Sequence, residues 1–232
     1  MSEKSNSKNK LFGLFFVLTV LIIIIAVIFA VRHINNVKAI EEAKVQKATL
    51  IVNRLYKDER LADGVTEITL NNARTATAEI EDETKKNKLA KQIKQATLLL
   101  EQQNDLIEQL DAFTTDDGDQ FIDDLTSVKV RELPVENISN AKIQEQALAK
   151  QTELIDWLAA SDELEVTIGQ LFTNGEQAKL APKVTDAQIK KAKEQIKTIK
   201  NEKKRVLFEV QINKAVKLSA ELAKKNKAKA DS

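Results

Sequence analysis

A long apolar stretch stands near the N-terminus of the chain. Residues 11–31 carry no charge, and only Gly13 and Thr19 among them fall outside the hydrophobic class. At about 1.5 Å per residue, a helix of this length spans roughly 30 Å, the thickness of the hydrocarbon core of a bilayer. Lys10 and Arg32 flank the stretch on its two sides. The pattern therefore predicts a transmembrane helix over 11–31.

A cleaved signal peptide is the alternative interpretation, because the stretch follows a basic segment with Lys4, Lys8 and Lys10. The apolar region of a signal peptide usually spans about 7–15 residues and ends in small residues at alternate positions. Here the run is longer, and Ile28 stands two residues before Ala30, where a small residue would be needed. We therefore expect an uncleaved signal anchor, with the N-terminus in the cytoplasm and the long region after the anchor outside the membrane.

Beyond this stretch, apolar residues recur at helical spacing, and the chain resembles itself. Residues 65–99 align with residues 184–218 at a constant offset of 119, and a leucine–aromatic pair just upstream aligns at an offset of 116. The matches fall mainly on apolar positions. They predict a repeated fold rather than a repeated chemistry.

A weaker copy of the same pattern lies between these two. The aromatic residues Tyr56, Phe113 and Phe172 are separated by 57 and 59 residues. We therefore predict three repeats of about 57–59 residues, of which the middle one is degenerate and acidic. A shift of 59 residues places Leu148, Ile155 and Leu158 opposite Leu89, Ala96 and Leu99.

Each repeat is predicted to form two helices. A threonine suited to capping a helix, Thr66 or Thr185, precedes a short apolar stripe, and a polar break precedes a longer one. Such pairs cannot bury their stripes alone, so we expect them to pack in tandem. The predicted fold class is all-α, with about three two-helix repeats forming an elongated rod. The predicted repeat core comprises Leu55, Tyr56, Val65, Leu70, Ala73, Ile80, Leu89, Ile93, Ala96, Leu99, Phe113, Leu148, Ile155, Leu158, Leu171, Phe172, Val184, Ile189, Ala192, Ile199, Phe208, Ile212, Ala215 and Leu218.

These patterns divide the chain into seven segments. We expect a short cytoplasmic tail (1–10), the transmembrane helix (11–31), a juxtamembrane helix or linker (32–50), the first repeat (51–113), the acidic second repeat (114–172), the basic third repeat (173–224) and a lysine-rich tail (225–232).

The two clearer copies carry a specific sequence pattern. They read LYKDERLADGVTEITLNNARTATAEI from residue 55 and LFTNGEQAKLAPKVTDAQIKKAKEQIKTI from residue 171. This pattern resembles the small helical repeats of Gram-positive cell-surface proteins related to a C-terminal domain of insecticidal crystal toxins. It is more weakly similar to the three-helix albumin-binding and sugar-binding modules of such surfaces. The resemblance implies a surface interaction or spacer module without catalytic residues. The C-terminal KKNKAKADS departs from such proteins, since it has no hydrophobic wall-sorting tail.

The composition narrows the chemistry that the chain can perform. It has no cysteine, which excludes disulfides, thiol catalysis and cysteine-ligated metal sites, and its single histidine excludes the usual histidine-based metal clusters. No serine or aspartate has a basic partner at the spacing of a known catalytic motif. We expect no enzymatic activity, no catalytic residue and no cofactor.

The acidic loop after Phe113 holds clustered carboxylates, which calcium favours. Asp116, Asp117, Asp119 and Asp123 are weak candidates for metal ligands, but the loop lacks the alternating acidic positions and the final glutamate of a calcium-binding loop. We therefore predict no metal site, and expect helix capping and a turn to explain the loop.

The net charge of +1 conceals a strong segregation of charge. Residues 105–165 carry 16 acidic and 4 basic side chains, and residues 176–232 carry 16 basic and 7 acidic ones. Solvated helix faces are the simplest interpretation. The alternatives are contact between the second and third repeats and head-to-tail association of neighbouring molecules. Nucleic acid is a poor fit for the basic segment, because no aromatic residues suited to stacking stand among its lysines.

These observations lead to one preferred function and one alternative, besides a third possibility that needs the opposite topology, a cytoplasm-facing coiled-coil regulator. We expect a single-pass membrane protein of a bacterial envelope whose extracytoplasmic region binds or spaces other components, with the bilayer and an envelope protein or wall polymer as partners. The alternative is a membrane-tethered assembly or scaffold factor, in division or secretion, that forms homo-oligomers through its helices.

Overall fold

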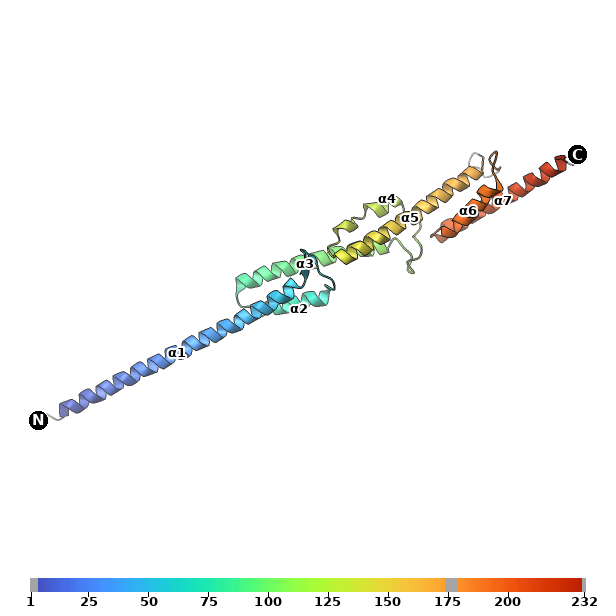
Figure 1. Cartoon of the computed structure of the whole chain (residues 1–232). Coiled ribbons are helices and arrows are strands. Elements are labelled where there is room, and N and C mark those ends of the chain that lie inside the picture. The colour runs from blue at the N-terminus through green and yellow to red at the C-terminus, as the bar shows by residue number, and fades with distance from the viewer. Residues whose placement is uncertain (1–3, 174–178, 231–232) are drawn as a thin grey trace. The chain divides into compact units, whose positions relative to one another are not determined.

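The fold is all-α. The computed structural model describes the backbone of residues 4–173 and 179–230, and the side chains of these residues except 4–25, 28, 229 and 230. The described residues form seven α-helices, two 3-10 helices and one two-stranded hairpin (Figure 1). The chain divides into two compact parts, Met1–Leu98 and Leu99–Ser232.

The N-terminal part is built on one long helix. It contains α1 (Lys4–Asn53), the antiparallel strands β1 (Tyr56–Lys57) and β2 (Arg60–Leu61), α2 (Glu67–Ala78) and the beginning of α3 (Glu83–Asp111). The C-terminal end of α1 packs against α2. Ala48 and Val52 are buried there, four residues apart on one face of the helix, and Leu55 is buried just after the helix ends.

The predicted transmembrane segment belongs to α1. Its residues 11–25 and 28, together with the flanking Lys10, have side chains outside the described ones, whereas Arg32 is described and exposed. Among the residues that the structure does describe, no helix has the length and apolar content needed to cross a bilayer. The transmembrane helix therefore stays a prediction from the sequence.

The C-terminal part holds two apolar cores. It comprises the rest of α3, α4 (Ser127–Glu132), the 3-10 helix η1 (Val135–Asn137), α5 (Ala141–Leu171), α6 (Asp186–Gln195), the 3-10 helix η2 (Ile196–Thr198) and α7 (Glu202–Ala230). The middle core consists of Leu106, Leu110, Phe121, Leu125, Val130, Leu133, Val135, Ile138, Ala147, Leu154 and Leu158. The C-terminal core consists of Leu164, Ile168, Leu171, Phe172, Ile189, Ala192, Ile199, Phe208, Ile212 and Ala215.

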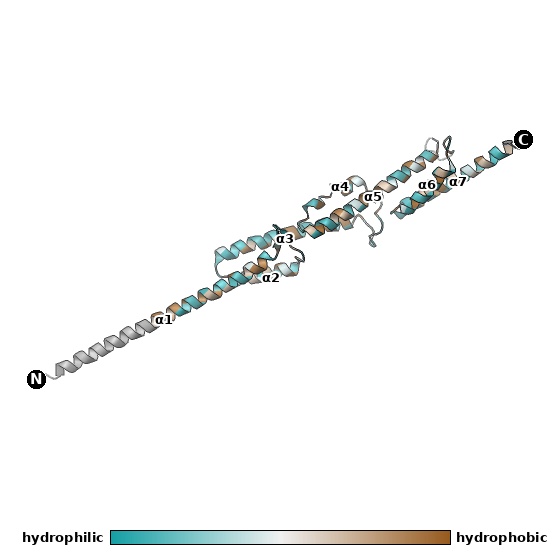
Figure 2. Ribbon diagram, in the orientation of Figure 1, coloured by the Kyte–Doolittle hydropathy of each residue, from teal (hydrophilic) through white to brown (hydrophobic). Residues whose placement is uncertain are grey.

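Helix α5 contributes to both of these cores. Its first half supplies Ala147, Leu154 and Leu158 to the middle core. Its second half supplies Leu164 and Ile168 to the C-terminal core. Figure 2 shows apolar residues recurring between polar ones along this helix, as the burial of one helix face requires.

A β-bridge and a closing backbone hydrogen bond, as in a hairpin, follow each of the helices α1, α3 and α5. The backbone N–H groups of Ala62, Ile122 and Ala181 donate to the carbonyl oxygens of Leu55, Phe113 and Leu171, at 3.0, 3.1 and 3.0 Å respectively. We call these the first, second and third hairpins. Phe113 therefore occupies the position of Leu55 and Leu171. Its predicted alignment with Tyr56 and Phe172 is wrong by one residue, because Thr114 forms the bridge that corresponds to those of the two aromatic residues.

A turn and a helix cap follow each hairpin. Gly64, Asp124 and Lys183 have φ angles of 76°, 60° and 72°. Two residues later, Thr66, Thr126 and Thr185 accept hydrogen bonds through their side chains from the third residue of the next helix. These bonds satisfy backbone donors that a helix start leaves free.

A buried isoleucine stands two residues before the capping residue of each of the helices α3, α5 and α7. Ile80, Ile138 and Ile199 are 1%, 1% and 5% exposed. Two residues after each isoleucine, the side-chain oxygens of Asp82, Asn140 and Asn201 accept hydrogen bonds from the first turn of α3, α5 and α7. Isoleucine, any residue, then aspartate or asparagine thus precedes α3, α5 and α7.

The middle copy has a different register from the predicted one. Counted from its capping residue, the seventh position of each long helix is Leu89, Ala147 or Phe208, and all three are buried. Leu148, which we expected in the core, is 41% exposed. The offset between the first two long helices is 58 rather than 59, the same offset that separates Leu55 from Phe113 in the hairpins.

The other residues of the predicted repeat core are buried or partly buried. The partly buried ones are Tyr56, Val65, Leu99, Phe113, Ile155, Val184 and Leu218.

The register of α5 can be tested with a matched pair of substitutions. Leu154 is 1% exposed and Leu148 is 41% exposed. We expect Leu154→Ala to lower the free energy of unfolding by about 2–5 kcal/mol, because it leaves a cavity. Leu148→Ala should change it by less than about 0.5 kcal/mol. Urea unfolding, followed through the fluorescence of Trp157, measures both, and equal losses would contradict the register.

Candidate interaction surfaces

A buried asparagine joins the second hairpin to the start of α7. The side-chain amide of Asn201 donates to the carbonyl oxygen of Phe121 at 3.0 Å and to Oδ1 of Asp123 at 3.1 Å. Its Oδ1 accepts from the N–H of Lys204 at 2.8 Å. Asn201 is only 4% exposed, so these three bonds satisfy a polar group that water hardly reaches.

Backbone contacts reinforce this junction. The N–H of Phe121 donates to the carbonyl oxygen of Lys200 at 2.8 Å. The N–H of Glu202, in the first turn of α7, donates to Oε1 of Gln120 at 3.0 Å. The second hairpin thus supplies hydrogen-bond partners to backbone groups at the start of α7. These bonds connect residues about 80 positions apart in the sequence.

The carboxylate of Asp123 completes the junction. Its Oδ2 lies 3.2 Å from Nζ of Lys203. The hydrogen bond from Asn201, followed by that from Lys203, lowers the pKa of the Asp123 carboxyl below its ordinary value. Both interactions favour the ionised form of the group.

The N-terminal part has a different closure at the start of α3. Oε1 of Glu41 accepts from the backbone N–H groups of Glu81 at 2.7 Å and Asp82 at 3.0 Å. The bond from Asp82 is the largest cause that lowers the pKa of Glu41. Lys44 pairs with Glu81 at 3.2 Å, and this hydrogen bond raises the pKa of the lysine. Helix α1 therefore holds the chain where α3 begins.

The weak metal candidates do not form a ligand set. Asp123 is engaged by Asn201 and Lys203, and Oδ1 of Asp119 accepts from the hydroxyl of Thr115 at 3.5 Å. Asp116 and Asp117 are exposed. Nowhere among the described residues do three His, Cys, Asp or Glu side chains converge as metal ligands would.

Two surface depressions lie beside Lys150. One, of about 460 Å³, is lined in part by Glu153 and Trp157, and the other, of about 550 Å³, is lined by the acidic loop. Lys150 pairs with Asp111 at 2.7 Å. Trp157 packs against the middle core, and Nζ of Lys200 lies 5.6 Å from its ring centroid. The indole of Trp157 therefore packs against the middle core and also contacts the ammonium group of Lys200.

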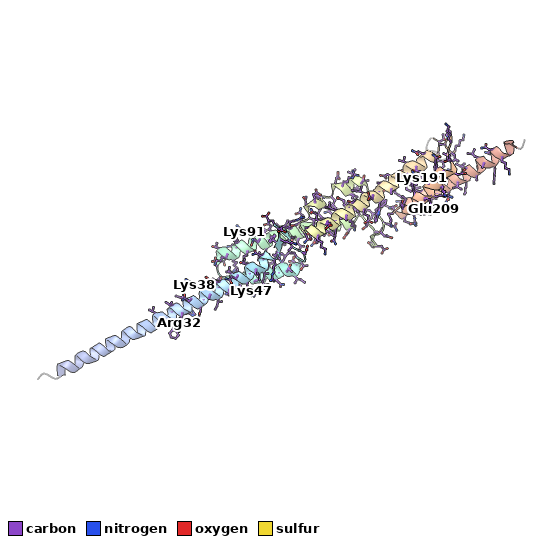
Figure 3. The ribbon with its side chains drawn as sticks, viewed as in Figure 1. Arg32, Lys38, Lys47, Lys91, Lys191 and Glu209 are labelled. Carbon is purple, nitrogen blue, oxygen red and sulfur yellow. The ribbon has the colours of Figure 1, made fainter. Side chains whose placement is uncertain are left out.

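The charged side chains of the last segment differ in their pairing. Lys191 on α6 lies 3.8 Å from Glu163, while Glu209 projects from α7 (Figure 3). Along the described half of α7 after Ile212, the lysines have no ion pair among the described residues. They are Lys214, Lys217, Lys224, Lys225 and Lys227. This surface is exposed and basic.

The apolar pattern of the long helices ends in α7. The residues 24 and 28 positions after the capping residue are Leu106 and Leu110 in α3, and Leu164 and Ile168 in α5. These four lie in the middle and C-terminal cores. The corresponding residues of the last segment are Lys225 and Lys229. The sequence therefore replaces a core-forming face with lysines.

Comparisons with known proteins give no further assignment. No protein-family model, no curated protein and no solved structure matches the chain. The resemblance to Gram-positive surface repeats therefore stays an expectation from the sequence.

Stability should depend on the asparagine junction. We expect Asn201→Ala to lower the free energy of unfolding by roughly 1–3 kcal/mol, because the buried carbonyl of Phe121 loses its donor. Asn201→Asp keeps an acceptor for Lys204 but places a second carboxylate beside Asp123, so it should also destabilise. Asn213→Ala, at an exposed position of the same helix, is the control. If urea unfolding shows that Asn201→Ala loses no more free energy of unfolding than the control, the junction does not stabilise the fold.

The junction should also depend on pH. Because the folded pKa of Asp123 is lowered, its contribution is present above the pKa of the unfolded carboxyl, about 3.9, and is lost as the pH falls through the folded pKa. We expect the stability difference between the wild type and Asp123→Asn to shrink below about pH 4. Urea unfolding over a pH series measures it. Asp116→Asn, in the same loop, is the control, and a constant difference for Asp123→Asn would contradict the prediction.

Proposed function

We propose that the chain is a membrane-anchored, extracytoplasmic protein of the bacterial cell envelope that acts as a non-enzymatic binding or spacer module. In this proposal residues 11–31 span the membrane, and the following residues form a tandem array of three helical repeats. Its partner is another envelope protein or a wall polymer. The observation that carries the proposal is the uncharged 21-residue segment, together with its place in the same helix as the first packed residues.

The continuity of α1 supports an anchored arrangement. The helix runs from Lys4 to Asn53 without a break, and its first half-buried residue after Arg32 is Glu41. The eight exposed residues between them place Glu41 roughly 14 Å along the helix from Arg32. A helix of this kind would hold the packed region clear of the lipid head groups.

The recurring hairpin, threonine cap and aspartate or asparagine cap support the repeat array. They occur three times, at intervals of 58 to 61 residues. The array would begin where Glu41 closes the start of α3, and it would end where lysines replace the apolar face. Polar terminal surfaces of this kind are needed by repeat proteins, because their outermost units have no neighbour.

The ionisable groups support a role without catalysis. Among the described residues with a resolved shift, the acidic groups Glu41, Asp82, Asp123 and Glu194 all have lowered pKa values, and each of them is held by hydrogen bonds. The pKa of Tyr56 is raised by burial. None of these shifts moves a group toward neutral pH, as general acid–base catalysis favours.

The topology can be tested because the chain has no cysteine of its own. Leu50→Cys introduces a thiol at a position that is 56% exposed. In intact Gram-positive cells, we expect a membrane-impermeant maleimide to label this variant. The matched variant Ser7→Cys, on the other side of the apolar segment, should be labelled only after lysis. Labelling of Ser7→Cys alone in intact cells would reverse the topology, and release of both from the membrane fraction would exclude the anchor.

A further inference from the structure

An acidic stripe runs along the exposed face of α5. We define the α5 stripe as the residues spaced by three and four positions from Glu145 to Val166, all of which are exposed. Residues at this spacing share one face of a helix. The α5 stripe comprises Glu145, Leu148, Thr152, Asp156, Ala159, Glu163 and Val166.

A basic stripe runs along the exposed face of α7 at the same spacing. The α7 stripe comprises Val206, Val210, Lys214, Lys217, Glu221 and Lys224, all of which are exposed. Its three lysines form no ion pair with any residue that the structure describes. The α5 stripe has no cation and three carboxylates, of which Glu163 already lies 3.8 Å from Lys191 of α6. Glu145 and Asp156 are the carboxylates that make the two stripes complementary in charge.

Both stripes also expose large aliphatic side chains among their charges. In the α5 stripe, Leu148 is 41% and Val166 is 60% exposed. In the α7 stripe, Val206 is 50% and Val210 is 62% exposed. Single exposed aliphatic residues are common, but here two lie on each of two oppositely charged helix faces. A partner that offers both an opposite charge and apolar contacts fits each face.

The two stripes cannot satisfy one another within a single chain. Helices α5 and α7 already pack together through their inner faces, where Leu164 and Ile168 share the C-terminal core with Phe208 and Ile212. The stripe residues are exposed, and none of the ion pairs among the described residues joins one stripe to the other. A contact between them therefore needs two molecules.

We infer that the α5 stripe of one copy of this chain binds the α7 stripe of a second copy. An anionic polymer fits this surface less well, because it would pair with the lysines but offers nothing to the valines and is repelled by the α5 stripe. Two different but complementary surfaces on one chain give either a two-fold dimer that makes the contact twice or an open chain of molecules. This self-association goes beyond the proposed anchoring and does not depend on the topology.

Sedimentation of the full-length protein in detergent micelles tests the inference. We expect association at about 0.1 M salt and dissociation at about 1 M, where the Debye length falls from about 10 Å to about 3 Å. Charge reversal of the α7 stripe (K214E, K217E and K224E together) should weaken association at low salt at least roughly tenfold, and so should reversal of the α5 stripe (E145K and D156K together).

The mixture of the two reversed variants gives the sharpest comparison. One variant then carries acidic residues on both stripes, and the other carries mainly basic ones, so mixing them should restore association that neither shows alone. Since the substituted residues are exposed, circular dichroism and urea unfolding should match the wild type. Association that resists both salt and charge reversal would instead come from the apolar N-terminal segment, and would overturn the inference.

Crosslinking tests the contact without altering any charge. We expect a short bismaleimide to join Ala159→Cys in one copy to Val210→Cys in another at low salt. The control is Val128→Cys, which is 59% exposed on α4 and outside both stripes. Equal crosslinking of the control would overturn the inference. The inference would also be overturned if the wild-type protein stays monomeric at low salt while added polyphosphate binds its lysines. Neither outcome would affect the maleimide labelling of Leu50→Cys, which tests the anchor separately.

Discussion

Each apolar core of the C-terminal part needs more apolar surface than its own short helix can supply. Helices α4 and α6 have 6 and 10 residues, and helices this short are marginal in water by themselves. The missing surface comes from a long helix that has already helped to close the preceding core. Helix α5 is the clearest case, since its two halves belong to two cores. The two cores are therefore joined by a rigid element and not by a flexible linker.

This sharing explains why the hairpins and polar caps recur. A long helix must end at a fixed residue, and the chain must reverse there before the short helix begins. Otherwise the apolar face of the short helix would not pack against the core that the long helix helps to form. The left-handed residue before each threonine cap sets the reversal, and the aspartate or asparagine cap sets where the next long helix starts. Asn201 adds a contact to the hairpin 80 residues before it, which fixes the start of α7 against the middle core.

The sequence predicted the helical core well where apolar spacing alone determines it. Leu89, Ala96, Phe208 and Ala215 follow helical periodicity, and all are buried. The prediction was wrong at Leu148, because it aligned Phe113 with Tyr56 and Phe172 and so used an offset of 59, whereas the first two copies are 58 residues apart.

The polar junction was not predicted from the sequence. The residues that form its hydrogen bonds are distant along the chain, and the sequence around a single asparagine does not indicate which residue it will contact. Isoleucine followed two residues later by aspartate or asparagine occurs at Ile80, Ile138 and Ile199, but it occurs equally at Ile34, Ile51 and Ile122, where no helix starts. The pattern therefore does not identify the caps from the sequence. The clustered carboxylates of the loop made Asp123 a candidate metal ligand. The sequence alone does not indicate that Asn201 and Lys203 lie beside it and bind its carboxylate.

The shared helix also has a consequence for the newly made chain. The second half of α5 ends at Leu171, and its apolar face is covered only when α7 has been made as far as Ala215. At about 5–20 residues per second, synthesis of the intervening 44 residues takes roughly 2–9 s. During this interval the face formed by Leu164 and Ile168 is open to chaperones and to other nascent chains. Premature termination within this stretch would release a product with a complete middle core and an exposed apolar face on α5.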